Sequence, residues 1–351
     1  MRPCHGDRVS DALGYRKVGR CLAETGRNCY CADVTEHPVA WEWYKRGGCL
    51  MLRAAGSERR FSCGSFLAIL HPPDRTRDTT AVDFAPLLRV HLTYLWQHRR
   101  ALRLRTPQRF TEWVQHRKLH DRDPRLPGLV DKVAVKELVA ATLGPDWVIP
   151  TLWHGRELPT RPPAPLPLVI KARHGCGHIA FVRTAAEWDV ARSQAAHWVK
   201  VRYGRWLDEW AYTAVPPGLL IEPYLGRGET LPLDYKLFVF GGRVAFVQVH
   251  LDRASAHRWI VMDREWIRAS PPTCDPDPLR PATLDRLIVG AERLAVGHQF
   301  LRIDCYEVAG QPLFGEVTVY PGSGLLPVVP ASLDRHMGAL WRQAREDLRC
   351  S

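Results

Sequence analysis

Two short apolar segments near the C-terminus, each with one carboxylate, constrain the fold more than any other part of this chain. Residues 300–306 carry Asp304 and residues 312–318 carry Glu316, and a turn containing Gly310 lies between them. Alternating apolar segments around such a turn predict a β-hairpin in which the two carboxylates converge. Two unpaired carboxylates in an apolar setting require a cation. Mg²⁺ is the natural candidate because it binds oxygen ligands and is usually shared with nucleotide phosphates.

The composition fits a globular protein that binds anions. The chain has 351 residues, 46% of them hydrophobic, which is enough for a buried core. The formal charge of +12 favours nucleotides, phosphorylated or carboxylated substrates, nucleic acid or an acidic membrane surface, without choosing among them. No apolar run approaches the roughly 20 residues of a membrane-spanning helix, so we expect a cytoplasmic protein.

The first 83 residues lack a sustained hydrophobic period. They contain six of the ten cysteines, at spacings that match no zinc ligand set. We expect a poorly ordered N-terminal extension. Residues 84–130 follow as a basic helical segment. Within it, 84–105 reads as an amphipathic helix that either packs on the domain or contacts an anionic membrane surface at the inner face of the membrane. Its expected apolar side consists of Leu87, Leu88, His91, Leu92, Leu95 and Trp96.

Strands and helices alternate in the rest of the chain. Thr184 and Glu187 have the spacing of a capping box that begins a helix, and Gly241-Gly242 can close a hairpin. Helices are expected from 131 to 143, from 185 to about 203 and from 283 to 296; strands are expected at 168–171, 179–182, 219–222, 235–240 and 243–250. The fold class is therefore α+β or α/β, with a mixed or antiparallel sheet.

A lysine and a glycine loop form a candidate phosphate site. Lys171 ends a buried apolar strand, and the loop that follows contains His174, Gly175 and Gly177, whose small residues let backbone amides approach an anion. The P-loop and dinucleotide fingerprints are both absent. An ordinary hairpin would also explain a strand that ends in lysine and glycine, so this signal is weak alone.

Another strand end offers groups for a nucleoside. Residues 222–225 place Glu222 near a ribose, and Tyr224 and Leu225 near a purine, after the strand at 219–222. An exposed glutamate at a strand end is the simpler reading of this segment alone. Lys236 follows in the next hairpin, and the acidic strands come last.

In this order, the motifs resemble the ATP-grasp superfamily from about residue 131 to 324. The resemblance implies an ATP-grasp domain at 131–348, with a small lid at about 168–225 and a core at about 226–348 whose mixed or antiparallel sheet is flanked by helices. It implies ATP and Mg²⁺ as cofactors. In this resemblance, the two nucleotide-binding lysines correspond to Lys132 and Lys171, and the flexible loop corresponds to His174, Gly175 and Gly177. The hinge corresponds to Glu222, Tyr224 and Leu225. The metal ligands correspond to Asp304, Glu316 and Thr318.

The chain is more closely similar to the TupA-like branch, which is associated with teichuronopeptide and other cell-surface polysaccharide biosynthesis. The matching motifs are 104–110, 121–124, 233–238 and 315–324. Thr318 stands where most ATP-grasp members have Asn, and a hydroxyl is a weaker Mg²⁺ ligand than an amide carbonyl. The sequence thus argues more firmly for one metal ion than for two.

The resemblance implies an ATP-dependent ligase that activates a carboxylate as an acyl phosphate and joins it to an amine. Lys236 would assist phosphoryl transfer, and Arg253 and Arg302 would hold the carboxylate or acyl phosphate, although a structural ion pair explains either arginine equally well. The partner would be a carboxylate- and amine-bearing small molecule or a glycan precursor. An ATP-dependent phosphotransferase acting on a sugar or glycan is the alternative. No nucleic-acid-binding motif accompanies the positive charge.

Overall fold

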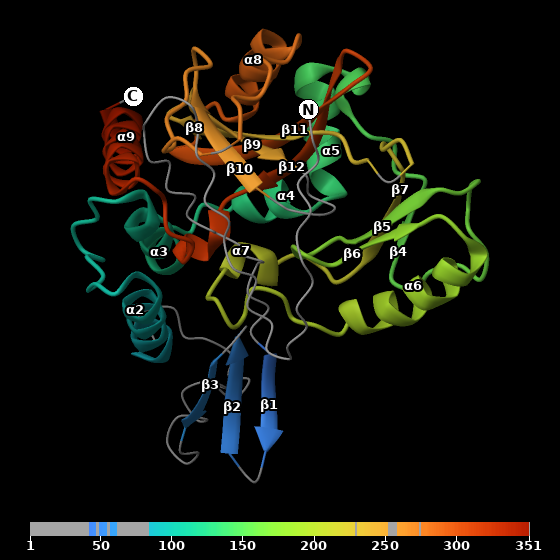
Figure 1. Cartoon of the computed structure of the whole chain (residues 1–351), viewed down its shortest axis with the longest axis horizontal. Coiled ribbons are helices and arrows are strands. Elements are labelled where there is room, and N and C mark those ends of the chain that lie inside the picture. The colour runs from blue at the N-terminus through green and yellow to red at the C-terminus, as the bar shows by residue number, and fades with distance from the viewer. Residues whose placement is uncertain are drawn as a thin grey trace, which may run out of the picture.

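The computed structural model describes residues 84–228, 230–251, 258–273 and 275–350, and the backbone of three strands upstream of them. These strands are β1 (Glu42–Arg46), β2 (Cys49–Ala54) and β3 (Ser57–Phe61), and they pair in that order as an antiparallel sheet. The sequence did not lead us to expect them. The remaining elements form two sheets with their helices, a five-stranded sheet, called the core sheet here, and a four-stranded sheet at the predicted position of the lid, called the lid (Figure 1).

The core is a five-stranded sheet with the order β10-β9-β8-β11-β12, in which every neighbouring pair is antiparallel. Its strands are β8 (Asp234–Phe240), β9 (Arg243–Leu251), β10 (Arg258–Asp263), β11 (Phe300–Val308) and β12 (Gln311–Thr318). Gly241 and Gly242 have φ of +56° and +78°, which glycine adopts without strain, and they close the β8-β9 hairpin as predicted. Both predicted hairpins are confirmed, and β10 is an additional strand.

Alternation along the strands separates the two faces of the core sheet. One face is apolar, with Leu237, Val247 and Ile303 buried, and the helices α4 (Leu126–Val130), α5 (Ala134–Leu143) and α8 (Leu284–Leu294) belong to the same core. The predicted helix at 283–296 is thus confirmed. It buries Leu284, Leu287, Ile288 and Leu294, as its period predicted.

The other face of the core sheet is apolar at one end and polar at the other. At the apolar end, Phe240 and Phe300 pack against Phe110 of α3 (Phe110–His120) and Trp341 of α9 (Ala331–Cys350). The 3₁₀ turn η2 (Pro321–Gly324) packs against α3. The main core therefore includes helix α3, which lies upstream of residue 131.

The N-terminal helix of the described region differs from its prediction. Helix α2 (Phe84–His98) ends seven residues before Arg105, and Arg99 has a positive φ of 54°. It buries Pro86, Arg89, Val90 and Tyr94, whereas Leu92 and Leu95 are 41% and 48% exposed. The predicted packing side was wrong because Tyr94 bonds Thr111 of α3 and Arg89 bonds Asp208, which turns the helix.

The lid is a four-stranded antiparallel sheet with the order β4-β7-β5-β6. Its strands are β4 (Trp153–Gly155), β5 (Leu168–Ala172), β6 (Ile179–Val182) and β7 (Leu219–Pro223). The capping box of Thr184 and Glu187 begins α6 (Ala185–Trp198), whose buried side covers one lid face (Figure 1). The short elements η1 (Pro145–Trp147) and α7 (Trp210–Thr213) complete the fold.

Within the described residues, no helix combines the length and apolarity that crossing a membrane requires.

Candidate nucleotide and phosphoryl-transfer site

The two acidic strands meet as the sequence predicts. Asp304 of β11 lies opposite Glu316 of β12 on one side and Lys236 of β8 on the other. Because residues directly opposite in an antiparallel pair share a face, all three side chains lie on the polar face of the core sheet. A β-bulge follows Asp304, and a Cβ at Gly315 would lie 3.0 Å from the carbonyl oxygen of Asp304. Glycine at this position permits the close approach of the two strands.

Asp304 is not an unpaired carboxylate, which corrects one premise of the sequence argument. Arg302 donates to both of its oxygens, Nε to Oδ1 and Nη2 to Oδ2, each at 2.7 Å. Lys236 also donates to Oδ2, and its Nζ lies 2.7 Å from Oδ2 of Asp234. Arg302 is two residues from Asp304 on the same strand and therefore on the same face. The sequence already contained this signal.

Glu316 joins the core to the lid loop through Lys132. The Lys132 ammonium lies 3.0 Å from Oε2 of Glu316 and donates to the carbonyl oxygen of Gly175 at 2.8 Å. Burial raises the pKa of Glu316, but the charges of Lys132, Lys236 and Arg302 outweigh it and lower that pKa to about 2. With its side chain 28% exposed, Glu316 is an ionised and accessible carboxylate.

In the lid, Glu222 binds two lysines. Lys171 of β5 lies 2.6 Å from Oε2, and Lys136 of α5 lies 2.5 Å from Oε1. Glu222 is 5% exposed, and the two ammonium groups hold its pKa below the usual range even though burial acts to raise it. Sequence reasoning missed Lys136, although it lies one helical turn after Lys132. A ribose hydroxyl would have to compete with both lysines for Glu222.

The predicted glycine loop lies beside Lys132, but its histidine has a structural position. His174 is buried; its Nδ1 accepts from the Gly218 amide at 3.3 Å, so Nε2 carries the proton and donates to the Val201 carbonyl at 3.1 Å. A phosphate contact through the ring would break one of these bonds. Gly175 packs against Tyr203, where a Cβ would lie 2.7 Å from the ring. Gly177 has a φ of +77° and open space around it.

The hinge residues lie at the end of β7. Tyr224 donates to the Gly228 carbonyl at 2.9 Å and packs edge-on against Phe181 of β6. Leu225 is half-buried. Arg253 lies outside the described residues, so its predicted substrate contact stays a prediction.

The structure also reveals a buried polar cluster that sequence reasoning missed. Lys118 of α3 donates to Oγ of Ser323 at 2.6 Å, and Gln115 donates to the Ser323 carbonyl at 2.8 Å. Burial lowers the pKa of Lys118 to about 8 against the opposing effect of Glu209, whose own pKa burial raises. No local pattern marks these residues, because they come from three distant segments.

The oxygen atoms at the hairpin are of the kind that Mg²⁺ binds together with substrate phosphates. Glu316 and Thr318 present such oxygens, whereas both oxygens of Asp304 accept from Arg302 and Lys236, so a metal ion on Asp304 would have to displace these cations. The hydroxyl of Thr318 accepts from Arg302 Nη2 at 2.9 Å. Within the described residues there is no cluster of three or more His, Cys, Asp or Glu arranged to hold a metal ion.

A short segment forms ion pairs with Glu316 of the core sheet and with Glu222 of the lid sheet. Residues 131–136 contribute Asp131, which binds Arg173 through both oxygens at 2.7 and 2.5 Å, as well as Lys132 and Lys136. The arrangement of an antiparallel core sheet with paired acidic strands, a lid sheet bearing a lysine and a glycine loop, and a linking segment is the ATP-grasp fold. The chain belongs to the TupA-like ATP-grasp family, whose model matches residues 112–342.

Several solved ligases are similar to this chain at low identity. A D-alanine–D-alanine ligase from Bacillus anthracis complexed with ATP has 15% identity and a TM-score of 0.41, with 63% of this chain and 66% of that chain covered. An L-amino acid ligase from Bacillus licheniformis has 13% identity and a TM-score of 0.36, with 54% and 44% covered. The ATP-grasp ligase PsnB, complexed with a minimal precursor, has 13% identity and a TM-score of 0.36, with 64% and 62% covered. No curated protein matches the sequence.

Proposed function

We propose that this protein is an ATP- and Mg²⁺-dependent ligase that activates a carboxylate as an acyl phosphate and joins it to an amine. The observation that carries the proposal is the polar face of the core sheet, where Arg302 and Lys236 converge on Asp304 beside Glu316 and Lys132. Phosphoryl transfer requires mainly positioning and charge neutralisation, which fixed cations next to carboxylate metal ligands can supply.

In the first step, an oxygen of the substrate carboxylate attacks the γ-phosphorus of ATP. The new O–P bond gives an acyl phosphate, and the bond from phosphorus to the β,γ-bridging oxygen breaks to release ADP. Asp304, Glu316 and Thr318 would hold Mg²⁺, which neutralises phosphate charge when bound. Lys171 would bind the α- and β-phosphates. Lys236 and Arg302 would exchange their carboxylate partner for oxygens of the transferring phosphoryl group.

In the second step, the amine nitrogen attacks the acyl carbon. A C–N bond forms, the bond from carbon to the phosphate oxygen breaks, inorganic phosphate leaves, and the nitrogen loses a proton. Arg302, whose guanidinium is held at the site by Asp304 and Thr318 before substrate binds, would hold the leaving phosphate in bidentate fashion once phosphate oxygens have replaced Asp304 as its partner.

The test is to trap the activated carboxylate. Purified protein is incubated with ATP, Mg²⁺, hydroxylamine and single candidates such as uronic acids, glutamate or acidic glycans. A ligase should form a hydroxamate and ADP in equal amounts, and only when the carboxylate is present. A phosphorylated sugar without hydroxamate would instead identify the alternative function, an ATP-dependent phosphotransferase. If protein that binds Mg·ATP forms neither product with any candidate, the result would count against both the ligase and the phosphotransferase.

The biological setting that we propose is cell-surface polysaccharide or teichuronopeptide-like biosynthesis, with a glycan precursor as one substrate. Membership of the TupA-like family supports this setting. We further propose that the protein contacts an anionic membrane surface through residues 84–105, because Leu92 and Leu95 are exposed on α2 and Arg99, Arg103 and Arg105 follow. Flotation with anionic vesicles tests it. Unchanged flotation of a Leu92→Glu, Leu95→Glu variant would contradict this surface.

A further inference from the structure

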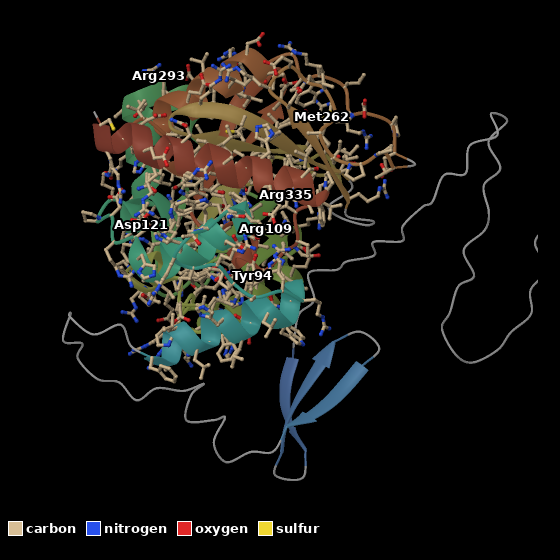
Figure 2. All side chains as sticks on the ribbon, turned by 90° about the vertical axis from the view of Figure 1, so that its left-hand side faces the viewer. Tyr94, Arg109, Asp121, Met262, Arg293 and Arg335 are labelled. Carbon is tan, nitrogen blue, oxygen red and sulfur yellow. The ribbon has the colours of Figure 1, made fainter. Side chains whose placement is uncertain are left out.

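A second polar hollow lies on the core, away from the acidic hairpin. It is a cavity of about 120 Å³, partly open to solvent, between α3, α9 and the start of β11. Figure 2 shows the side of the molecule on which α9 and α3 lie next to each other. Asp121, which is labelled there, lies at the C-terminal end of α3. Gln299, in its wall, directly precedes β11, three residues before Arg302 and five before Asp304. The Phe300 ring, packed against Phe240 and Trp341, lies on the sheet face between the hollow and these two residues, so the hollow is distinct from the proposed phosphoryl-transfer site.

Two arginines of the hollow are stacked on a pair of tryptophans. Arg117 lies over the ring of Trp341 at 4.5 Å, and Arg345 lies over the ring of Trp113 at 5.5 Å. The two indoles are themselves stacked, with centroids 6.1 Å apart and planes at 13°. A guanidinium that lies on an aromatic face keeps its N–H groups in its own plane, where they can bind an oxyanion.

A third arginine is held in place as well. Arg122 lies 5.4 Å from the centroid of the Trp210 ring, and its Nη1 donates to the carbonyl oxygens of Lys118 at 3.0 Å and Asp121 at 2.8 Å. Fixing these side chains before binding reduces the conformational entropy that a ligand contact would otherwise cost.

Positive charge in the wall exceeds negative charge. Among the described residues that line the hollow, Asp121 is the one carboxylate, and it accepts from Arg117 Nε at 3.1 Å. Arg345 Nη1 instead lies 3.3 Å from Nε2 of His116. Because a guanidinium can only donate, His116 Nε2 is the acceptor of this hydrogen bond. Burial, followed by the charge of Arg345, lowers the pKa of His116 to about 4. The local potential is thus positive and favours an anion.

We propose that this hollow is a binding site for an oxyanion, a phosphate or carboxylate group of a small molecule, held by Arg345 and Arg122. A phosphate and a carboxylate each present two oxygens that a planar guanidinium can bind side by side. The anion-binding inference does not rest on the proposed ligase reaction, because it depends only on the arginines, tryptophans and charge of this hollow.

The site is tested by calorimetric titration in chloride buffer at constant ionic strength. Inorganic phosphate is the ligand in one titration, and citrate is the ligand in another. Arg345→Gln should weaken binding by about tenfold or more, the loss of one charge-assisted bidentate contact. Arg342→Gln removes the same charge from an exposed position on the same helix and should bind as the wild type does. Binding of phosphate alone, citrate alone or both identifies the anion class.

A second readout distinguishes this hollow from the nucleotide site and from a general effect on α9. Bound anion should raise the pKa of His116, followed by NMR titration of the ring and assigned with His116→Asn. If Arg345→Gln and the wild type bind equally, or the His116 titration does not move with saturating anion, the proposal is wrong. Absence of any binding by the wild type up to about 10 mM would also overturn it.

Discussion

Glu222 is the shared counterion of two lysines, one in the lid and one on α5. It neutralises both Lys136 and Lys171 in a buried position, so Glu222→Gln leaves two ammonium groups without their counterion. Removal of one partner from a buried ion pair is strongly destabilising, and we expect a loss of about 2 to 4 kcal/mol in the free energy of unfolding. Urea unfolding measures it, with Glu346→Gln, an exposed change on α9, as the control. A loss no larger than that of the control would contradict the burial of this cluster.

Glu316 tests the metal assignment at the same scale. Glu316→Gln keeps the shape of the side chain but removes the charge that Mg²⁺ and Lys132 both require. We expect Mg·ATP turnover to fall by at least about 100-fold, because a fixed charge that stabilises phosphoryl transfer commonly contributes about 3 kcal/mol. Coupled-assay kinetics and circular dichroism measure activity and folding. Unchanged turnover in a folded variant would remove Glu316 from the proposed metal site.

At the level of elements, the bulge between β11 and β12 sets the position of the carboxylates. Gly315→Ala would place a Cβ 3.0 Å from the Asp304 carbonyl oxygen, so the strands would have to separate. We expect about 1 to 2 kcal/mol of destabilisation and weaker Mg·ATP turnover.

Gly128→Ala provides the matched control for this change. Gly128 lies within α4, is exposed and has nothing within 4 Å of the added Cβ. Alanine there should be neutral or stabilising by up to about 1 kcal/mol. Thermal unfolding of both variants measures the contrast. Equal effects would show that contact with Asp304 is not the constraint.

The whole molecule should lose stability in mild acid because of two histidines, His116, which is partly buried, and His298, which is buried. Burial lowers the pKa of His116 to about 4, assisted by Arg345, and burial with Arg125 lowers that of His298 to about 4. The unfolded chain, with a histidine pKa near 6.5, binds these protons first. The contribution that these two neutral histidines make to the free energy of unfolding is therefore fully present above pH 6.5, and it is lost as the pH drops towards 4. After allowance for solvent screening, we expect about 1 to 2 kcal/mol per histidine.

A variant with His116→Asn and His298→Asn cannot take up these two protons. Its unfolding free energy should therefore fall less than that of the wild type between pH 6.5 and 4, as denaturant titrations at several pH values would reveal. His197→Asn, an exposed change on α6, should keep the wild-type profile. Parallel profiles for the double variant and the wild type would mean that other groups cause the acid sensitivity.

Local patterns predicted much of the secondary structure. The hairpin of β11 and β12, the hairpin closed by Gly241-Gly242 and the capping box at Thr184 depend on neighbours within a few residues, so their signals are contained in short segments. Strands β1 to β4 and β10, and helix α9, were not anticipated. The side that α2 buries was also beyond local reasoning, because Thr111 and Asp208 fix it from other parts of the chain.

By itself, the sequence determined the order of the site motifs and the convergence of Asp304 with Glu316, since strand period and turn chemistry are local properties. Only the tertiary structure decided which charges meet. It pairs Asp304 with Lys236 across 68 residues and Glu222 with Lys136 across 86, and it stacks arginines of α3 and α9 on two tryptophans. Such contacts depend on how sheets and helices pack, because groups distant in sequence meet only when apolar faces are buried together.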